Sequence, residues 1–394
     1  MTDTLSYFSG ERPVVPLKMG MIGGGPGAFI GDVHRMAARL DGEITLVGGV
    51  FSRDEGKSRA QGAELHLDPA RIYPDYNSLL KSEAALSPTE RMDFISIVTP
   101  NHLHFPVAAA ALSKGFAVLS DKPATLDLEE AILLQEIVEK TGGLYGLTQT
   151  YLGYPMVRQA RYMVANGDLG KIRRITVDYP QGWLSRDLEK SGNRQAAWRT
   201  MPETSGISGC FSDIGTHAHS LVEYISGDQM HSVCAALNSV GAGRLLDDDG
   251  AVLFRMAGGA EGSLSASQIC AGADNGLMIR IYGEKASLSW LQQRPDQLLF
   301  TPQGAPQQVW VAGTDKAYLC AAARRSCRLP AGHPEGYIEA FANIYRDFAA
   351  SLRGDILDEP PVGIKEGVRG MAFVAAVIAN HQATEKWTEI KLCR

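Results

Sequence analysis

The sequence predicts an α/β protein: a doubly wound parallel sheet comes first, followed by an α+β domain with a large, mainly antiparallel open sheet. Short apolar runs alternate with amphipathic stretches over the first 150 residues, which is typical of a parallel sheet covered on both faces. Segments of alternating polar and apolar residues follow in series from about residue 230. At 394 residues the chain is too long for one ordinary core, so about two to three domains are expected.

Residues 18–150 are expected to form the first domain. Five apolar runs predict its strands: Met19–Ile22, Ile44–Phe51, Phe94–Val98, Phe116–Leu119 and Leu144–Leu147. The apolar periodicity predicts helices over Val107–Lys114 and Leu128–Lys140, the latter led by Thr125 and Asp127 as candidate caps. Residues 1–17 hold no sustained apolar stretch, so we expect an N-terminal arm rather than a signal peptide.

Residues 151–394 are expected to form the second domain, which serves substrate binding and self-association. A helix near Met156–Asn166 and a strand at Ile172–Tyr179 come first. Alternating patterns then predict seven strands: Ser232–Val240, Ala251–Met256, Gly262–Ile269, Leu277–Tyr282, Ala286–Leu291, Gln297–Phe300 and Gln308–Val311. Two late amphipathic helices, Glu335–Leu352 and Lys365–Thr384, are the candidates to cover the apolar face of this sheet. The opposite face is the expected contact surface of a homodimer or homotetramer.

Composition excludes several classes of partner. The formal net charge of -6 and the lack of a basic run argue against nucleic acid. No run of about 18 apolar residues is present, so no membrane span is expected. The six scattered cysteines form no C-x-x-C pair, which favours free thiols in a reducing, cytoplasmic compartment. They are Cys210, Cys234, Cys270, Cys320, Cys327 and Cys393.

A glycine-rich segment, Gly23-Gly24-Gly25-Pro26-Gly27-Ala28, follows the first strand and precedes a helix-like stretch. That context is typical of a dinucleotide site, where glycines allow a tight turn and the helix N-terminus faces the pyrophosphate. Strict spacing puts Ala28 in the third glycine position; a longer loop would give that position to Gly31. The predicted cofactor contacts in this segment are Gly23, Gly25, Gly27, Ala28 and Phe29.

Two further strand ends are expected to face the cofactor. Ser52 and Arg53 follow the second strand, and an arginine there accommodates the 2′-phosphate of NADP. Asp54, one residue later, could instead support NAD. Thr99, Pro100, Asn101 and His104 follow the strand Phe94–Val98 and are predicted to lie near the nicotinamide ribose. No metal is expected, because His102 and His104 lack a convergent carboxylate or cysteine.

A lysine stands at the end of a strand that is predicted to be buried. Asp121-Lys122-Pro123 follows the run Phe116–Leu119, and ligands of open α/β sheets bind at such strand ends. A buried ammonium group needs a partner or a shifted pKa. Lys122 is therefore predicted to be catalytic and, with Asp121, to face the cofactor.

Asp213 and His217 are the candidate partners of this lysine. They stand four residues apart before an apolar-periodic stretch, Ala218–Ile225, so on a helix they would share one face. A carboxylate beside an imidazole orients it and suits it for proton transfer near neutral pH. The alternative interpretation is a helix cap at Asp213 and a core histidine at 217.

These motifs resemble the glucose–fructose oxidoreductase and inositol dehydrogenase family. Its acidic residue–lysine–proline signature corresponds to Asp121-Lys122-Pro123, with Asp in place of the commoner Glu, and its D-x-x-x-H motif corresponds to Asp213 and His217. The resemblance runs from Lys18 to the C-terminus and implies a Rossmann domain followed by a large open sheet. Further segments resemble the levoglucosan dehydrogenase branch: Gly23–Gly31, His34–Met36, Gln181–Trp183, Trp198-Arg199 and His333–Tyr337.

The resemblance implies an oxidoreductase that moves a hydride between NAD or NADP and a ring carbinol of a cyclic sugar, anhydrosugar or polyol. The predicted substrate contacts are Tyr151, Gln181, Trp183, Arg199, Asp213 and His217. Trp183 offers a ring for stacking, and the polar residues offer hydrogen bonds to hydroxyl groups. Two alternatives are an enzyme whose tightly bound nicotinamide is recycled internally, and a non-catalytic nucleotide-binding sensor. The sensor would be expected to lack the lysine–histidine pair that this chain has.

Overall fold

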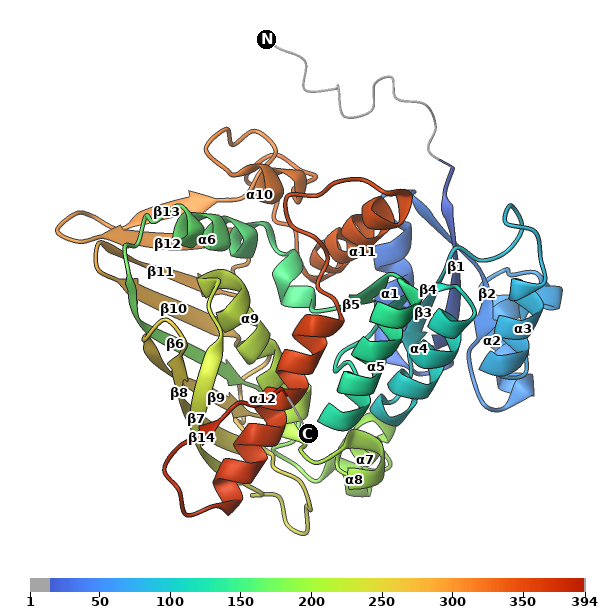
Figure 1. Ribbon diagram of the computed structural model, residues 1–394, viewed down its shortest axis with the longest axis horizontal. Coiled ribbons are helices and arrows are strands. Elements are labelled where there is room, and N and C mark those ends of the chain that lie inside the picture. Colours follow the sequence, from blue (N-terminus) through green and yellow to red (C-terminus); the bar gives the residue numbers. More distant parts are fainter. Residues whose placement is uncertain (1–14, 393–394) are drawn as a thin grey trace.

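The computed structural model describes residues 15–392 and shows two sheets with helices between and around them (Figure 1). Most of the expected arm over residues 1–17 lies outside this range, as does Cys393. Within residues 15–392, no helix has both the length and the apolar character that a bilayer span requires.

The N-terminal sheet is parallel, with strand order β2-β1-β3-β4-β5. Its strands are β1 (Leu17–Gly23), β2 (Ile44–Val50), β3 (Phe94–Val98), β4 (Ala117–Ser120) and β5 (Tyr145–Leu147). All five predicted strands are present, with ends shifted by no more than two residues. The strand order reverses direction between β1 and β3, and the carboxyl ends of these two strands form the switch point where such sheets bind ligands.

Helices cover both faces of this sheet. Those from the same part of the chain are α1 (Phe29–Leu40), α2 (Glu55–Glu64), α3 (Tyr76–Ala84), α4 (His104–Ser113) and α5 (Leu128–Thr141). The predicted cap Asp127 accepts a hydrogen bond from the Glu130 backbone (2.9 Å) at the start of α5. Thr125 is not the cap, because its hydroxyl donates to the Asp127 carbonyl (2.7 Å).

The second sheet has nine strands in the order β13-β12-β11-β10-β6-β9-β8-β7-β14. All pairs are antiparallel except β6 with β9. The strands are β6 (Ile172–Pro180), β7 (Met230–Asn238), β8 (Asp249–Met256), β9 (Glu261–Ser267), β10 (Met278–Gly283), β11 (Ala286–Leu291), β12 (Gln297–Pro302), β13 (Gln308–Val311) and β14 (Thr388–Glu389). The eight strands predicted after residue 150 are all found, while the short β14 was not predicted.

The inner face of the large sheet packs on α6 (Pro155–Ala165), α9 (Thr216–Ser226) and α12 (Ile364–Gln382) (Figure 1). The prediction that two late helices cover this sheet is correct for α12 and wrong for α11 (Tyr337–Arg353). That helix packs on α1 and closes one face of the N-terminal sheet, because its buried aromatic residues Phe341, Tyr345 and Phe348 fit that core. Helix α12 also contacts α5, so it lies between the two sheets.

The polar stretch from residue 181 to 212 carries short helices that the sequence pattern did not reveal. They are α7 (Arg194–Arg199) and α8 (Pro202–Ser205), and a π-helical turn at Phe211–Gly215 leads directly into α9. Another short helix, α10 (Ala321–Arg325), lies against α6. The loop from α7 to the π-helical turn links the two sheets at the edge where the strands of the first one end.

Candidate active site

The glycine-rich loop after β1 adopts a backbone that few other residues could follow. Gly23, Gly24 and Gly27 have φ values of +96°, +68° and +76°. A Cβ atom on Gly25 would lie 2.1 Å from the carbonyl oxygen of Phe51 at the end of β2. Side chains are thus excluded from the loop, which leaves its backbone open to close approach by a ligand.

Gly31, in the first turn of α1, occupies the close-packed position of the fingerprint. A Cβ atom there would lie 2.4 Å from the Gly24 Cα atom, so only glycine lets the helix approach the loop. Ala28, the strict-spacing candidate, is instead the N-cap and makes no side-chain cap bond. Phe29 begins the helix with its side chain two-thirds exposed (67%). The first backbone N–H groups of α1 thus lack a side-chain cap and are suited to an anion.

At the end of β2, two side chains already make hydrogen bonds within the protein, and a third is exposed. The Ser52 hydroxyl accepts a hydrogen bond from the Asp54 backbone (3.1 Å), and Asp54 caps α2 by accepting from the Lys57 backbone (3.0 Å). Arg53 is exposed. Burial, and then the nearby Arg53 charge, lower the pKa of His102. The positive charge of Arg53 therefore acts on the turn that follows β3.

The predicted contacts after β3 hold the site together as well as lining it. Thr99-Pro100-Asn101 enters a short turn, where the buried Asn101 amide donates to the Ser205 carbonyl (3.2 Å) in the second half of the chain. His104 is buried, and its two ring nitrogens lie 2.9 Å from the Thr99 carbonyl and 2.6 Å from the Pro123 carbonyl. This ring thereby links the ends of β3 and β4. Residues 15–392 contain no cluster of side chains that could hold a metal ion.

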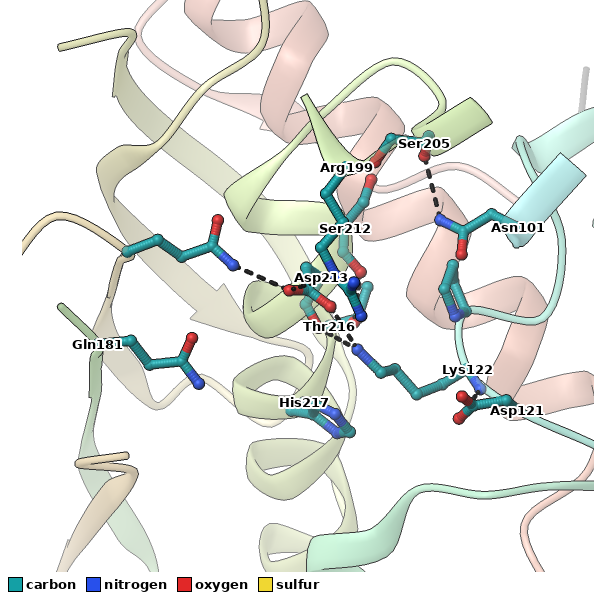
Figure 2. Close-up of polar contacts among 12 residues, drawn as sticks. Asn101, Asp121, Lys122, Gln181, Arg199, Ser205, Ser212, Asp213, Thr216 and His217 are labelled. Carbon is teal, nitrogen blue, oxygen red and sulfur yellow. Dashed lines mark hydrogen bonds and ion pairs between the residues drawn. The ribbon is translucent and has the colours of Figure 1, made fainter. Parts of the chain in front are cut away.

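Lys122 extends from the end of β4 across to the second half of the chain. Its ammonium nitrogen donates to the Asp213 carboxylate (2.8 Å) and to the Asp213 backbone carbonyl (2.6 Å) (Figure 2). Asp121 accepts from the Lys122 backbone (2.8 Å) and from the Thr148 hydroxyl (3.1 Å). The shorter aspartate thus anchors the strand end against β5, and the Lys122–Pro123 peptide that follows is cis.

Asp213 is the most heavily bonded carboxylate of the site. Besides Lys122, its second oxygen accepts from Gln268 (2.8 Å) and pairs with Arg199 at 3.4 Å (Figure 2). Burial alone would raise the pKa of Asp213, but Lys122 and then Arg199 outweigh that effect and hold the pKa well below its usual range. Asp213 is consequently ionised near neutral pH, and its negative charge fixes the positions of Lys122 and Arg199.

His217 is the second residue of α9, and its ring lies beside the end of the Lys122 side chain (Figure 2). Its Nδ1 atom is 3.1 Å from the amide oxygen of Gln149, and its ring packs edge-on against Tyr151 with centroids 4.8 Å apart. Burial, followed by the positive charge of Lys122, lowers the pKa of His217 well below 6.5, although Asp213 opposes this. The imidazole is therefore neutral near pH 7.

The structure places Asp213 and His217 near each other but gives them different hydrogen-bond partners. Residues 211–215 form a π-helical turn that leads into α9, and the charge of each residue acts on the pKa of the other. Among residues 15–392, Asp213 bonds Lys122, Gln268 and Arg199, whereas His217 bonds Gln149. Both residues still flank Lys122, as Figure 2 shows.

The predicted substrate contacts lie around this group, and some are engaged with each other. The Tyr151 hydroxyl bonds Tyr179 and accepts from Asn275 (3.1 Å). The Gln181 amide donates to the Asn275 side-chain oxygen (2.8 Å), and its side chain points toward His217 (Figure 2). Tyr151 is buried, so its ring forms a wall of the site while its hydroxyl serves this internal network.

Trp183 lies just after β6, and Arg199 is the last residue of α7. The Arg199 guanidinium is 4.2 Å from the Trp198 ring centroid and 6.0 Å from that of Trp183. The aromatic pair and the Asp213 carboxylate together orient the guanidinium at the site.

Four residues that line the site were missed by sequence reasoning: Gln149, Tyr179, Gln268 and Asn275. Gln149 follows β5, a position that strand-end reasoning could have flagged. Gln268 follows β9, whose end reaches the site only because β9 pairs in parallel with β6. No motif in the sequence signals that pairing.

Two domain families match the chain in succession. Residues 17–149 match the oxidoreductase family with an NAD-binding Rossmann fold, and residues 157–289 match the GFO/IDH/MocA C-terminal domain. An uncharacterized oxidoreductase of Bacillus subtilis, YfiI, is 30% identical across 98% of this chain and 100% of its own length. The chain belongs to the GFO/IDH/MocA oxidoreductase family.

Solved structures similar to this chain share its architecture over nearly its whole length. An inositol dehydrogenase homolog from Azotobacter vinelandii, in complex with NAD+, is 35% identical and superposes with a TM-score of 0.91 over 97% of this chain and 100% of that one. The levoglucosan dehydrogenase of Pseudarthrobacter phenanthrenivorans is 26% identical over 72% of this chain and 75% of its own length. The predicted family and fold class are therefore confirmed.

The site fits the cofactor of a GFO/IDH/MocA oxidoreductase. Glycines form a cradle that Cβ atoms would fill, and α1 begins without a side-chain cap. The Thr99 hydroxyl is buried and has no hydrogen-bond partner among the described residues. A buried polar group without a partner is costly, so a ligand that bonds it would stabilise this edge of the sheet.

Proposed function

We propose that this chain is an NAD(P)-dependent dehydrogenase that transfers a hydride between the nicotinamide and a secondary ring carbinol of a cyclic polyol or sugar. The observation that carries this proposal is the gathering of Lys122, Asp213 and His217 at the carboxyl edge of the parallel sheet. This group lies beside the switch point between β1 and β3, which supports a cofactor there and a substrate between the two sheets.

Residues of the first sheet would hold the cofactor. The glycine loop and the start of α1 suit the pyrophosphate, Ser52 and Arg53 suit the adenosine ribose, and Thr99 through Asn101 suit the nicotinamide end. Asp121 and His104 position the backbone around Lys122. When bound, the nicotinamide supplies the hydride acceptor or donor, as the cofactor does in such enzymes.

The protein's own groups handle the proton of the carbinol. An ammonium group has three donors, and Lys122 gives two to Asp213, so one remains for the substrate oxygen. His217, kept neutral by burial and by Lys122, accepts the hydroxyl proton during oxidation and returns it during reduction. Lys122 stabilises the oxygen as its negative charge develops, and Asp213 keeps Lys122 in place.

The loop between β6 and α9 is proposed to recognise the ring. Trp183 offers an apolar face, while Gln181 and Arg199 offer donors to ring hydroxyl groups. The Azotobacter vinelandii homolog, also solved with NADH and myo-inositol at 35% identity, supports a cyclic polyol. Levoglucosan dehydrogenase supports an anhydrosugar as the related class.

The choice between NAD and NADP is proposed from the end of β2. Arg53 is exposed and cationic, and the Asp54 carboxylate is already engaged as a helix cap. Both features favour the 2′-phosphate of NADP over a bare ribose diol. The NAD+ complex of the inositol dehydrogenase homolog supports NAD as well, so we propose that both cofactors are used, with NADP bound better.

The remaining proposals concern the molecule as a whole. We propose that residues 18–150 bind the cofactor and residues 151–394 bind the substrate and a second copy of the chain. The outer face of the large sheet supports self-association, because Leu253 is 48% exposed there and a hollow of about 640 Å³ opens beside Met278 and Leu291. The five described cysteines are free thiols, which supports a cytoplasmic setting.

A substrate panel tests the proposed activity. The purified chain is mixed with cyclic polyols, anhydrosugars and aldoses in the presence of NAD or NADP, and absorbance of the reduced nicotinamide is followed. Turnover with at least one cyclic carbinol is the expected result. Reduced-nicotinamide absorbance before any addition would indicate a tightly bound, recycled cofactor instead, and inertness toward the whole panel would contradict the proposal.

Lys122→Met tests the assigned group. We expect kcat to fall about a thousandfold, because a charge-stabilising donor at the reacting oxygen is lost, while cofactor affinity stays within a few-fold. Steady-state rates and fluorescence titration with the reduced cofactor measure the two effects. Lys285→Met, at an exposed lysine, is the matched control and should leave both unchanged. Loss of cofactor binding in Lys122→Met would give Lys122 a structural role.

A further inference from the structure

Gln149, the residue that follows the buried Thr148, lies beside the His217 ring. Gln149 is 5% exposed and begins the turn after β5. Its amide oxygen lies 3.1 Å from Nδ1 of His217. An amide oxygen can only accept a hydrogen bond, so this contact is a hydrogen bond only when Nδ1 of the neutral ring carries the proton. Nε2 then holds the free lone pair.

We infer that Gln149 is a positioning residue that fixes the Nδ1–H tautomer of His217 and thereby makes Nε2 the atom that accepts the carbinol proton. This inference rests on the proposed function in one respect only, namely that the accepted proton comes from the carbinol of the substrate. The tautomer itself is a property of the free protein.

The surroundings of His217 leave this role to Gln149. Tyr151 presents its ring edge at 4.8 Å and Tyr179 lies at 6.5 Å between centroids, so both contacts are aromatic. Lys122 can only donate hydrogen bonds, and Asp213 bonds other partners. Among the residues that the structure describes, Gln149 is thus the group that accepts a hydrogen bond from this imidazole.

Gln149 is itself held by the strand ends that carry Lys122. Thr148 donates from its hydroxyl to Asp121 (3.1 Å) and from its backbone to Ser120 (2.9 Å). Gln149 donates from its backbone to the Leu147 carbonyl (2.9 Å). The same bonds therefore set the positions of the ammonium group and of the imidazole acceptor, which ties both to the ends of β4 and β5.

The charge of the acceptor also matters. Titratable groups facing His217 are Lys122 from β4, Asp213 from the π-helical turn, Tyr151 from the turn after β5, and Tyr179 from β6. A neutral amide orients the ring and stabilises the imidazolium much less than a carboxylate at the same place would. A glutamine here keeps the base deprotonated while still choosing its tautomer.

Nitrogen NMR of the free protein provides the direct test. Long-range ¹H–¹⁵N correlation on protein labelled at histidine distinguishes protonated from unprotonated ring nitrogens, and a His217→Gln sample assigns the resonance. We expect a protonated Nδ1 and an unprotonated Nε2 in the wild type. The opposite tautomer would overturn the inference. The tautomer is measured without turnover. An inactive substrate panel would therefore contradict the proposed function but would not contradict the inference on the tautomer.

Two substitutions extend the test to catalysis. Gln149→Met removes the acceptor at similar volume, and we expect mixed tautomers with kcat lowered about a hundredfold at nearly unchanged KM. Gln149→Glu should shift the acid limb of the kcat–pH profile upward by about one pH unit or more, because the carboxylate stabilises the imidazolium.

The control is Gln159→Met on α6, away from the site. The buried amide oxygen of Gln159 accepts a hydrogen bond from the Cys320 backbone, and this variant removes that acceptor. It should change thermal stability without changing the pH profile. An unmoved acid limb in Gln149→Glu would overturn the inference, as would a wild-type His217 signal in Gln149→Met.

Discussion

At the scale of single residues, burial decides which groups of this chain carry charge. Asp213 stays ionised in a buried place because two cations face it, while His217, beside one of those cations, stays neutral. The same balance applies to His34 on α1, which packs against α11. Burial lowers the pKa of His34 to about 4, although Asp121 raises it in part. Each of these side chains therefore has one protonation state in the native protein near neutral pH.

The low pKa of His34 predicts an acid-dependent loss of stability. The unfolded chain binds a proton near pH 6.5 and the native chain only near pH 4, so stability present above pH 6.5 is lost as the pH falls through that window. We expect the free energy of unfolding of the wild type to drop about 3 kcal/mol more than that of His34→Gln over this range. Denaturant unfolding at both pH values measures it.

The exposed His333 supplies the control for that experiment. A His333→Gln variant should follow the wild-type pH dependence. A His34→Gln variant with the same slope as the wild type would show that the histidine is protonated in the native state as readily as in the unfolded one.

Arg53 carries the prediction on cofactor choice. Arg53→Ala should raise the KM for NADP about tenfold, because a charged partner of the 2′-phosphate is lost, and should leave the KM for NAD nearly constant. Initial rates with each cofactor at saturating substrate measure the effect. Arg59→Ala, six residues further on exposed helix α2, is the matched control. An equal change in the KM values for both cofactors would contradict the proposed contact between Arg53 and the 2′-phosphate.

Single residues also show how far the sequence predicted the site. Lys122, Asp213 and His217 were found because strand ends and a D-x-x-x-H pattern are visible in the chain. The pairing of Lys122 with Asp213 was predicted as well. The bonds of Asp213 to Gln268 and of His217 to Gln149 were not, because residue spacing carries no information on contacts between distant segments. Gln268 and Asn275 were missed because they reach the site through pairings across the large sheet.

At the scale of elements, the contact between β1 and α1 depends on two glycines. Gly24 and Gly31 approach so closely that a Cβ atom on the helical residue would lie 2.4 Å from the loop backbone. Backbone cannot yield as a flexible side chain can, so a larger residue must push the helix away from the strand. The helix N-terminus, and the phosphate site with it, would move as one piece.

Gly31→Ala tests this contact. We expect cofactor affinity to fall at least tenfold and the free energy of unfolding to fall by about 1–3 kcal/mol, as overpacking usually costs. Gly370→Ala, inside α12 with open space around its Cβ position, is the control and should be neutral or slightly stabilising. Calorimetry and reduced-cofactor titration read both effects. Unchanged affinity in Gly31→Ala would mean that the loop adapts.

The elements themselves were largely predictable, because strands and long helices leave periodic patterns. The alternation over β8 and the apolar run of β3 are examples, and their bounds shifted by at most two residues. The sequence pattern does not predict which of the two cores an amphipathic helix packs against. The apolar stripe of α11 fits either sheet in principle, and only the shape of its aromatic residues places it on the first.

At the scale of the whole molecule, the first sheet depends on residues from the far end of the chain. Phe341, Tyr345 and Phe348 of α11 are buried against strands β1, β3 and β4. Burying each such side chain contributes roughly 1.5–3 kcal/mol. Without α11, the part of this sheet face that α1 does not cover would be open to water, which weakens a domain of this size.

A fragment of residues 1–150 is therefore expected to lack cooperative folding. It should aggregate or bind a hydrophobic dye strongly, and its thermal melt should be broad. Fusing residues 335–354 to its C-terminus through a flexible linker restores the missing cover and should sharpen the melt. A cooperative melt of the unfused fragment would contradict this dependence on α11.

The position of α11 also bears on how the protein is made. Residues 337–353 leave the ribosome long after β5, the last strand of the first sheet, so during that time one face of this sheet lacks the cover that α11 provides. Chains usually fold their N-terminal domain first as it emerges; here that order is blocked. Premature termination anywhere before α11 would release a product with an exposed apolar sheet face, a substrate for chaperones and proteases rather than a partial enzyme.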